Sequence, residues 1–361
     1  MERVQNIESL SLMFTAGVAA GTLLLPGTGM LLPAVLLPIL ALPILLRDRL
    51  ARCREELSIG LILATFLLLG IFCARTAAIP CADLPNALEL WADAAVTRLR
   101  AHIYALPFPS EGTAALVSAL LTGEKGALPA DTVALFRGSG ASHLLALSGL
   151  HMGILYVLFN ALTKPLGGYR PARIVRAVLL VAGAGFFTLM AGAGPSLVRA
   201  FLFISINEIL RLFHRPRRGS QVFCVALLIQ LVWDPTVISS LGFQLSYLAM
   251  AGIFLLYPVL ERWYPADGRR FDPMRKLWSL AALSISCQVF TAPLAWLRFH
   301  TFPRFFLVTN LLALPLTSAF MTGALASLAL DGIGLTCQPL ITATDGLSRL
   351  LLWVLEVISS M

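Results

Sequence analysis

Apolar runs that are each about as long as a bilayer is thick dominate this sequence of 361 residues. A transmembrane helix needs about 20 mainly apolar residues, so these runs predict about eleven spans in an all-α polytopic membrane protein. Only 13% of the residues are charged, which excludes a soluble domain, where about a quarter are. A disordered chain is excluded because 58% of the residues are hydrophobic. The predicted spans are residues 10–28, 30–46, 57–73, 141–163, 174–193, 195–213, 220–233, 238–257, 277–297, 306–330 and 339–358.

Lysine and arginine gather in every second connection between these spans. By the positive-inside rule these connections are cytoplasmic, so the N-terminus is expected in the cytoplasm and the C-terminus in the periplasm. The formal net charge of +8 is therefore a signal of topology rather than of a nucleic-acid partner. The basic residues are Arg47, Arg49, Arg52 and Arg54; Lys164, Arg170, Arg173 and Arg176; Arg211, Arg215, Arg217 and Arg218; and Arg262, Arg269, Arg270, Arg275 and Lys276.

The segment from Cys73 to about residue 140 is then extracytoplasmic. Its first part predicts an amphipathic helix, because apolar residues recur at steps of three and four. Such a helix lies on the bilayer surface or packs across the bundle, and the pattern alone does not separate the two. Shorter helices are expected around 110–122 and 129–138. The apolar stripe is Leu88, Trp91, Ala95, Leu99 and Ile103.

Six cysteines bear on the redox state of the chain. Cys73 and Cys81 both fall at the outer face, eight residues apart, where a periplasmic disulfide is one reading and free thiols are the other. The remaining four read as small buried thiols. No spacing of cysteine and histidine indicates a metal site, and no cofactor is expected.

Residues 142–153 form the most polar stretch at membrane depth. On one helix Ser148 and His151 would be neighbours three residues apart, with His143 about two turns before His151. Three readings remain open: helix packing, a polar pore lining, or a Ser–His catalytic pair. Gly149 and Gly153 are four residues apart and predict a surface for close helix approach.

Arg199 is the most conspicuous charge inside a predicted span. It follows a Gly/Pro break at residues 192–195, where a guanidinium inside the bundle needs a partner or a hydrated path. The alternative is that its side chain snorkels to the outer interface. Further polar groups at membrane depth either join helices or line a path. They are Gln230, Gln244, Ser246, Gln288 and Asn310.

The connection over 296–306 mixes arginine with aromatic residues. Arg298 and Arg304 could hold the phosphates of a single strand while the aromatic rings stack on its bases. An aromatic belt at the membrane interface predicts much the same residues.

Several ordered motifs resemble those of the ComEC family of competence proteins. They are Ser-His-Leu-Leu-Ala-Leu-Ser-Gly-Leu-His-Met-Gly at 142–153, Gly-Phe-Gln-Leu-Ser at 242–246, Gln-Val-Phe-Thr-Ala-Pro at 288–293 and Thr-Asn-Leu-Leu-Ala-Leu-Pro at 309–315. Leu-Leu-Thr-Gly-Glu-Lys-Gly at 120–126 and Leu-Phe-Arg-Gly-Ser-Gly at 135–140 fit the same order.

The resemblance implies an inner-membrane channel for single-stranded DNA in natural transformation, not an enzyme. It divides the chain into a three-helix membrane region (1–73), a periplasmic amphipathic connector (74–109) and a competence-type channel domain (110–361). The expected form is short, without the OB-like and metallo-β-lactamase-like domains of full-length members. Ser148, His143, His151, Arg199, Gln244, Ser246, Gln288, Asn310, Arg298 and Arg304 would line the DNA path.

The family also implies partners. These are a periplasmic DNA receptor and a cytoplasmic ATP-dependent helicase-like motor. The motor is expected because the sequence has no Walker A loop with which to use ATP itself. A homodimer is also expected, although no sequence motif indicates it. Two alternatives remain: a transporter of another anionic or lipid-linked substrate, and an intramembrane hydrolase with Ser148 as nucleophile and His151 or His143 as base.

Overall fold

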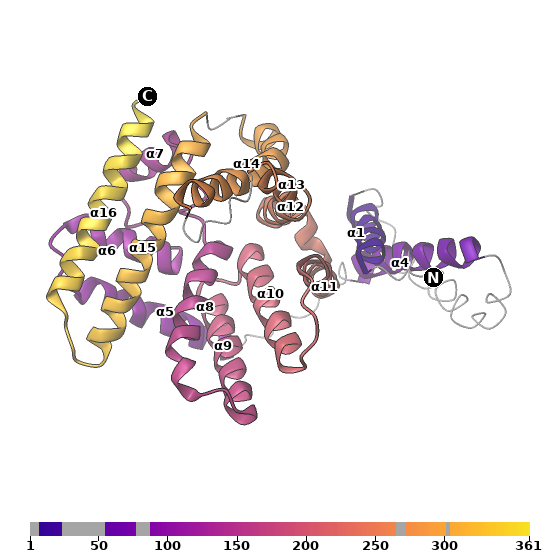
Figure 1. Cartoon of the computed structure of the whole chain (residues 1–361), viewed down its shortest axis with the longest axis horizontal. Helices are drawn as coiled ribbons and strands as arrows, with labels where there is room; N and C mark the ends of the chain where they lie inside the picture. Colours follow the sequence, from indigo (N-terminus) through magenta and orange to yellow (C-terminus); the bar gives the residue numbers. More distant parts are fainter. Residues whose placement is uncertain (1–6, 24–54, 77–86, 265–271, 301–303) are drawn as a thin grey trace. The chain divides into compact units, whose positions relative to one another are not determined.

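The computed structural model describes residues 7–23, 55–76, 87–264, 272–300 and 304–361, and every regular element in these ranges is helical. The all-α expectation is thus confirmed for the described residues. The chain divides into two compact units, residues 1–84 with 202–244 and residues 85–201 with 245–361. Figure 1 colours the helices along the sequence. The predicted span 30–46 and Cys81 lie outside the described residues, so the Cys73–Cys81 disulfide stays a prediction.

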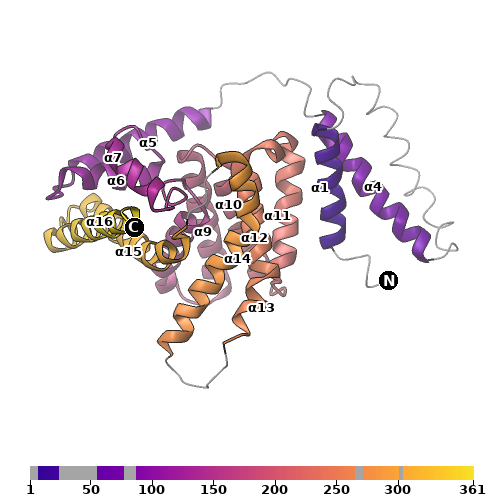
Figure 2. The same ribbon diagram turned by 90° about the horizontal axis from the view of Figure 1, so that it is seen from above.

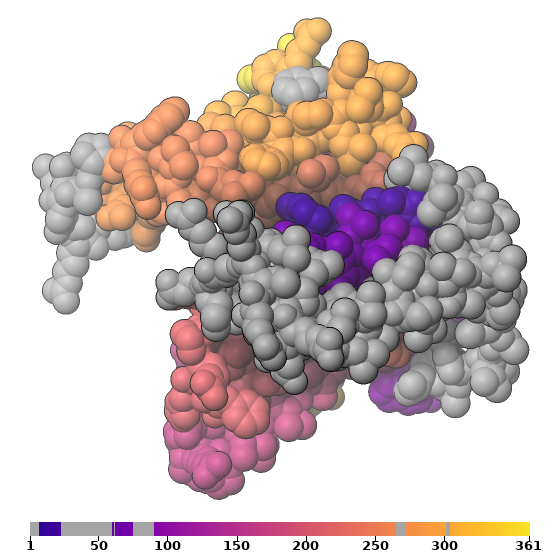
Figure 3. Space-filling model, turned by 90° about the vertical axis from the view of Figure 1, so that its right-hand side faces the viewer, coloured from indigo at the N-terminus to yellow at the C-terminus, as the bar shows by residue number. Residues whose placement is uncertain are grey.

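Small residues hold the first unit together. A Cβ added to Gly17 would stand 1.9 Å from the backbone oxygen of Leu67, and one added to Gly70 would stand 2.2 Å from the backbone oxygen of Phe14. Glycine at both sites lets two helix backbones touch, and Figure 3 shows the atoms of these two helices adjoining. The described elements of this unit are α1 (Ile7–Leu23), α4 (Glu55–Thr76), α11 (Gly219–Trp233) and η2 (Pro235–Ser239).

The second unit contains the main apolar core. Leu116, Leu120, Phe136, Phe320 and Leu351 meet in it, and Figures 1 and 2 both show α15 beside α16. In the view of Figure 1, α14 lies crosswise to this pair. The elements are α5 (Ala87–Ala105), α6 (Glu111–Thr122), α7 (Ala130–Gly138), α8 (Gly149–Leu162), η1 (Lys164–Leu166), α9 (Arg170–Met190), α10 (Pro195–Leu212), α12 (Leu241–Leu255), α13 (Tyr257–Glu261), α14 (Pro273–Phe299), α15 (Phe306–Gly332) and α16 (Gln338–Ser359), with α10 and α12 continuing into the first unit.

Four stretches of helix in the described part of the chain are both long and apolar enough to cross a bilayer. They coincide with the predicted spans 174–193, 238–257, 277–297 and 306–330. A membrane protein is therefore supported, whereas the count of eleven spans stays a prediction. The four stretches are Arg170–Met190, Leu241–Glu261, Pro273–Phe299 and Phe306–Gly332.

The predicted amphipathic helix exists as α5, but its buried face differs from the predicted stripe. Ala92, Val96 and Ile103 are buried, whereas Trp91 is exposed and its ring lies 5.1 Å from that of Phe186. The stripe is displaced because α5 packs on α6 and α9 together, so the direction of those neighbours decides which residues are covered. The reading of a helix packed on other helices is the one that this contact supports.

One contact bears on the predicted topology. Strict alternation places His102 outside the cell and Asp331 in the connection after the tenth span, inside. In the structure Nε2 of His102 lies 3.0 Å from Oδ2 of Asp331. The other carboxylate oxygen of Asp331, Oδ1, accepts a hydrogen bond from Oγ1 of Thr336. Two residues separated by a bilayer about 30 Å thick cannot be in contact. This contact and the strict alternation of all eleven predicted spans are therefore not compatible, and the topology stays a prediction.

Candidate functional site

The start of α8 differs from the predicted span 141–163. The helix begins at Gly149, and residues 139–148 form turns and bends that belong to no helix. Ser148 ends this segment with an extended backbone and caps the helix, so His143 does not share a helix with His151 as expected. His143 is exposed, and its Nδ1 lies 3.3 Å from the carbonyl oxygen of Gly140. Non-helical backbone in a membrane protein is tolerated where protein buries it or water reaches it.

Ser148 and His151 meet, as their spacing predicts, and they form a capping box. The backbone N–H of Ser148 donates to Nδ1 of His151 at 3.2 Å, and the Ser148 Oγ accepts from the backbone N–H of Leu150 at 3.3 Å. The Oγ itself lies 3.1 Å from the same Nδ1. His151 is fully buried, and its Nε2 has no hydrogen-bond partner among the described residues. The box explains why a polar pair begins an otherwise apolar helix.

Arg199 lies in the first turns of α10, after a turn in which Gly192 and Ala193 both have positive φ. Its guanidinium donates to the backbone carbonyl of Ser246 in α12. The same group stands 5.9 Å from the centroid of the Tyr247 ring, within the range of a cation–π contact. In the described part of the chain Arg199 forms no ion pair with a carboxylate.

Gly149 brings the start of α8 against Arg199. A Cβ at Gly149 would stand 3.2 Å from Nη2 of Arg199, whereas one at Gly153 would meet no described atom within 4 Å. The expected close helix approach is therefore wrong for Gly153, because no described helix backbone comes that near to it. At Gly149 the close neighbour is a guanidinium rather than another helix backbone.

These contacts bring three sequence motifs to one place: the start of α8, the arginine of α10 and the Ser246–Tyr247 pair of α12. A helix N-terminus carries about half a positive elementary charge, and here a guanidinium lies beside it. Both groups favour an anion, and backbone N–H groups with arginine are the usual ligands of a phosphate. This junction of α8, α10 and α12 is the candidate site.

The other predicted path residues lie elsewhere in the described structure. Gln244 belongs to the first unit, where its Nε2 donates to the carbonyl of Ile238 at 2.8 Å. Gln288 is half-buried in α14. The buried Oδ1 of Asn310 has no hydrogen-bond partner among the described residues. Arg298 and Arg304 are exposed on either side of 301–303, which is outside the described residues.

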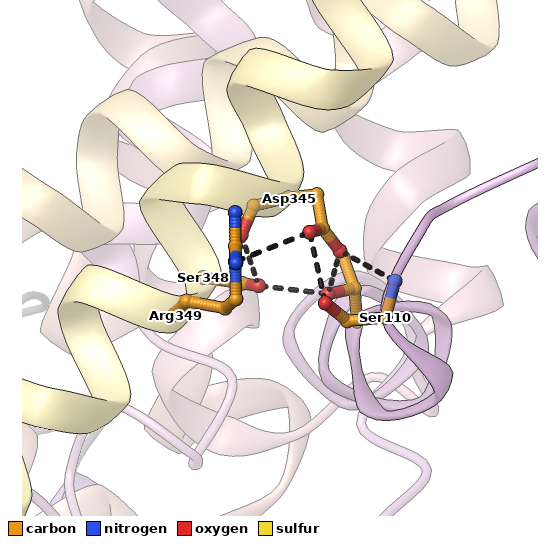
Figure 4. Close-up of polar contacts among 5 residues, drawn as sticks. Ser110, Asp345, Ser348 and Arg349 are labelled. Atoms are coloured by element: carbon orange, nitrogen blue, oxygen red, sulfur yellow. Dashed lines mark hydrogen bonds and ion pairs between the residues drawn. The ribbon is translucent and has the colours of Figure 1, made fainter.

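Sequence reasoning missed a buried carboxylate, Asp345 in α16, which Figure 4 shows. Its oxygens accept hydrogen bonds from the backbone N–H and Oγ of Ser110 and from the Oγ1 of Thr113, at 2.7–3.0 Å. Nε of Arg349 lies 3.4 Å away, and Ser348 bonds to Thr113. The carboxylate thus caps the N-terminus of α6, where a negative charge is favourable. The sequence signal that could have revealed this site is an acidic residue, Asp345, inside the predicted span 339–358.

Comparison with known proteins agrees with these motifs. The family model described as competence protein matches residues 120–361. Competence protein ComA of Neisseria gonorrhoeae is 30% identical over 252 residues, which cover 67% of this chain and 34% of ComA. ComE operon protein 3 of Bacillus subtilis is 26% identical over 239 residues, 65% of this chain and 29% of that protein.

The uncharacterized protein YcaI of Escherichia coli is 28% identical over 209 residues, 56% of this chain and 27% of YcaI. The chain thus matches about a third or less of the length of these curated relatives. No solved structure matches it significantly. The family model covers well over half of the chain and includes the residues of α8, α10 and α12 that meet at the candidate site. This chain is therefore a member of the ComEC family of competence proteins.

Proposed function

We propose that the protein is a channel that passes single-stranded DNA across the inner membrane during natural transformation. Membership of the competence family supports a role in DNA uptake. The finer role rests on the junction of α8, α10 and α12, because a strand that crosses a membrane needs a hydrated route with positive groups for its phosphates. Arg199 beside the N-terminus of α8 is the observation that carries this proposal.

In this proposal a phosphate of the strand competes with the Ser246 carbonyl for the Arg199 guanidinium. The bond from the guanidinium to the Ser246 carbonyl is charged only on the donor side, whereas a phosphate brings the opposite charge and can accept two parallel N–H bonds from arginine. The exchange is therefore favourable for the strand, and it need not move the backbone of α10. His151 and the segment 139–148 would form the neighbouring wall.

A charge series at Arg199 tests the proposal. Cells that carry Arg199→Lys, Arg199→Gln or Arg199→Glu are compared for uptake of a labelled strand, with the amount of membrane-inserted protein measured in each. We expect partial uptake with lysine, little with glutamine and least with glutamate, because the local charge falls in that order. Arg170→Gln, at the exposed start of α9, is the matched control. Wild-type uptake by the glutamate variant contradicts the proposal.

We further propose a cytoplasmic N-terminus, a periplasmic C-terminus and three kinds of partner: a periplasmic DNA receptor, a cytoplasmic ATP-dependent helicase-like motor and a second copy of the chain. The orientation rests on the basic clusters after the predicted spans. The motor is invoked because strand movement needs an energy source. Loss of cytoplasmic label with retained binding at the cell surface, in a strain without the motor, is the expected result.

A hydrolase is the second candidate, because the Oγ of Ser148 lies 3.1 Å from Nδ1 of His151. Ser148→Asn separates the two roles, since asparagine caps helices as well as serine does but offers no hydroxyl nucleophile. We expect Ser148→Asn to retain strand uptake, whereas Ser148→Ala loses stability at the start of α8. Complete loss of uptake in a normally folded Ser148→Asn variant would favour the hydrolase.

A further inference from the structure

The last helix, α16, has the length of a membrane span but not its surface. Its 22 residues reach about 33 Å, yet it is not among the helices that are apolar enough to cross. The side chain of Arg349 is 68% exposed and Trp353 is 59% exposed, with Leu350 and Glu356 on the same side. Exposed charges of both signs are costly in hydrocarbon and normal in the headgroup region.

The segment that precedes α8 contacts α16 from about one third of its length to its end, and it also contacts the end of α15 just before α16. At the end of α15, before α16 begins, His102 of α5 contacts Asp331. One third of the way along, Asp345 caps α6 through Ser110. At the other end α7 packs on α16, and a Cβ at Gly138 would stand 2.5 Å from the Oγ of Ser359. Figures 1 and 2 both show α6 and α7 beside α16.

These contacts restrict the topology of α16. If α16 crossed the bilayer, the chain from α5 to α7 would have to cross beside it. With 12 and 9 residues, α6 and α7 reach about 18 and 14 Å, so neither alone makes the crossing of about 30 Å. A crossing by both in series would place the non-helical link 123–129, with its exposed Lys125, at membrane depth, where a charge is costly. The residues around α5–α7 are also where the sequence predicts an extracytoplasmic segment. An α16 that stays on the side of α5–α7 satisfies every one of these contacts.

We infer that α16 is an interfacial helix that lies on the same membrane face as α5–α7 and presents its outer side to phospholipid headgroups. The outer side combines an arginine that can reach lipid phosphates, a tryptophan of the type that anchors proteins at the interface, and a leucine. Asp345 holds the inner side on α6. Both ends of α16, and the end of α15 at Asp331, then lie on one face. This inference does not depend on the proposed passage of DNA.

Cysteine accessibility at the two ends of α16 tests the inference. Cys337 precedes the helix and Ser360 follows it, so a variant that keeps only Cys337 is compared with a cysteine-free variant that carries Ser360→Cys. Leu335→Cys, at an exposed position, serves as well if Cys337 reacts slowly. A membrane-impermeant maleimide is applied to right-side-out and inside-out vesicles, with Thr97→Cys reporting on α5 and Arg215→Cys on the predicted cytoplasmic loop.

We expect both ends of α16 and position 97 to react from the same side, with at least fivefold more labelling in one vesicle orientation. Reaction of the two ends from opposite sides overturns the inference. Reaction of both ends from the side opposite to position 97 overturns it as well, because α16 would then not share a face with α5.

Fluorescence identifies what covers the outer side. In a variant whose only tryptophan is Trp353, lipids brominated near the headgroup should quench at least twofold more strongly than lipids brominated at the chain ends. Stronger quenching by the deep bromines indicates a helix in hydrocarbon, and no quenching by either indicates a protein partner. Both results contradict the inference.

Discussion

Substituting alanine for Gly149 perturbs the junction of α8, α10 and α12 with a single methyl group. The new Cβ would stand 3.2 Å from Nη2 of Arg199, inside the optimal separation of about 3.5–4.0 Å between non-bonded carbon atoms. The guanidinium must therefore shift by a few tenths of an ångström away from the start of α8, and we expect this shift to weaken its hydrogen bond to the Ser246 carbonyl. A hydrogen bond from a charged group contributes about 1.5–3 kcal/mol, so weakening this one by half costs about 1 kcal/mol.

The same substitution also favours the helix. Replacing glycine with alanine inside a helix stabilises it by roughly 0.5–1 kcal/mol, and Gly153→Ala offers this gain with no described atom within 4 Å. We therefore expect Gly153→Ala to stabilise the protein and Gly149→Ala to leave its stability unchanged or slightly lower. The helix gain is common to the two variants, so their difference, about 1 kcal/mol, measures the contact with Arg199.

Thermal unfolding of the two purified variants in the same detergent, followed by circular dichroism, measures this difference. Uptake of a labelled strand is measured in parallel, and we expect it to fall with Gly149→Ala alone. Equal shifts in unfolding temperature together with equal uptake would refute the reasoning, because Gly149 would then have no special relation to Arg199.

Two further predictions concern helix contacts away from this junction. A Cβ at Gly252 would stand 2.3 Å from the backbone oxygen of Ser286, so Gly252→Ala should force α12 from α14 and destabilise the protein by about 1–3 kcal/mol. The control in the same unfolding assay is Gly346→Ala, where a Cβ would meet open space. Equal stabilities of the two variants would contradict the packing of α12 on α14. Asp345→Asn should lower the free energy of unfolding by about 3 kcal/mol, because its charged hydrogen bonds are weakened. A double-mutant cycle with Thr113→Val should show a coupling energy of about 1 kcal/mol or more. Additive effects of the two substitutions would argue against the cap of α6.

The positions of most helices followed from the sequence. The apolar runs at 174–193, 277–297 and 306–330 predict α9, α14 and α15 to within a few residues, because a run of apolar residues long enough to cross a bilayer forms a helix wherever it is inserted. The short helices α6 and α7 were also predicted.

The site followed from the sequence only in part. Ser148 and His151 were predicted to meet because three residues separate them, but a spacing does not reveal where a helix begins. The break at 139–148 and the capping box came from the structure. Arg199 was singled out as a charge in an apolar run, whereas its neighbours Ser246 and Tyr247 come from a helix about 50 residues away. Asp345 was missed for the same reason, because its partners precede it by more than 230 residues.

By itself the sequence determined that the chain is helical, belongs in a membrane and carries the competence motifs, because hydrophobicity and order along the chain are local properties. Only the tertiary structure decided which polar groups meet. It set Arg199 against the start of α8, Asp345 against the start of α6, and His102 against Asp331. These pairings depend on how helices distant in sequence pack, and apolar runs that all favour burial carry little information about which of them become neighbours.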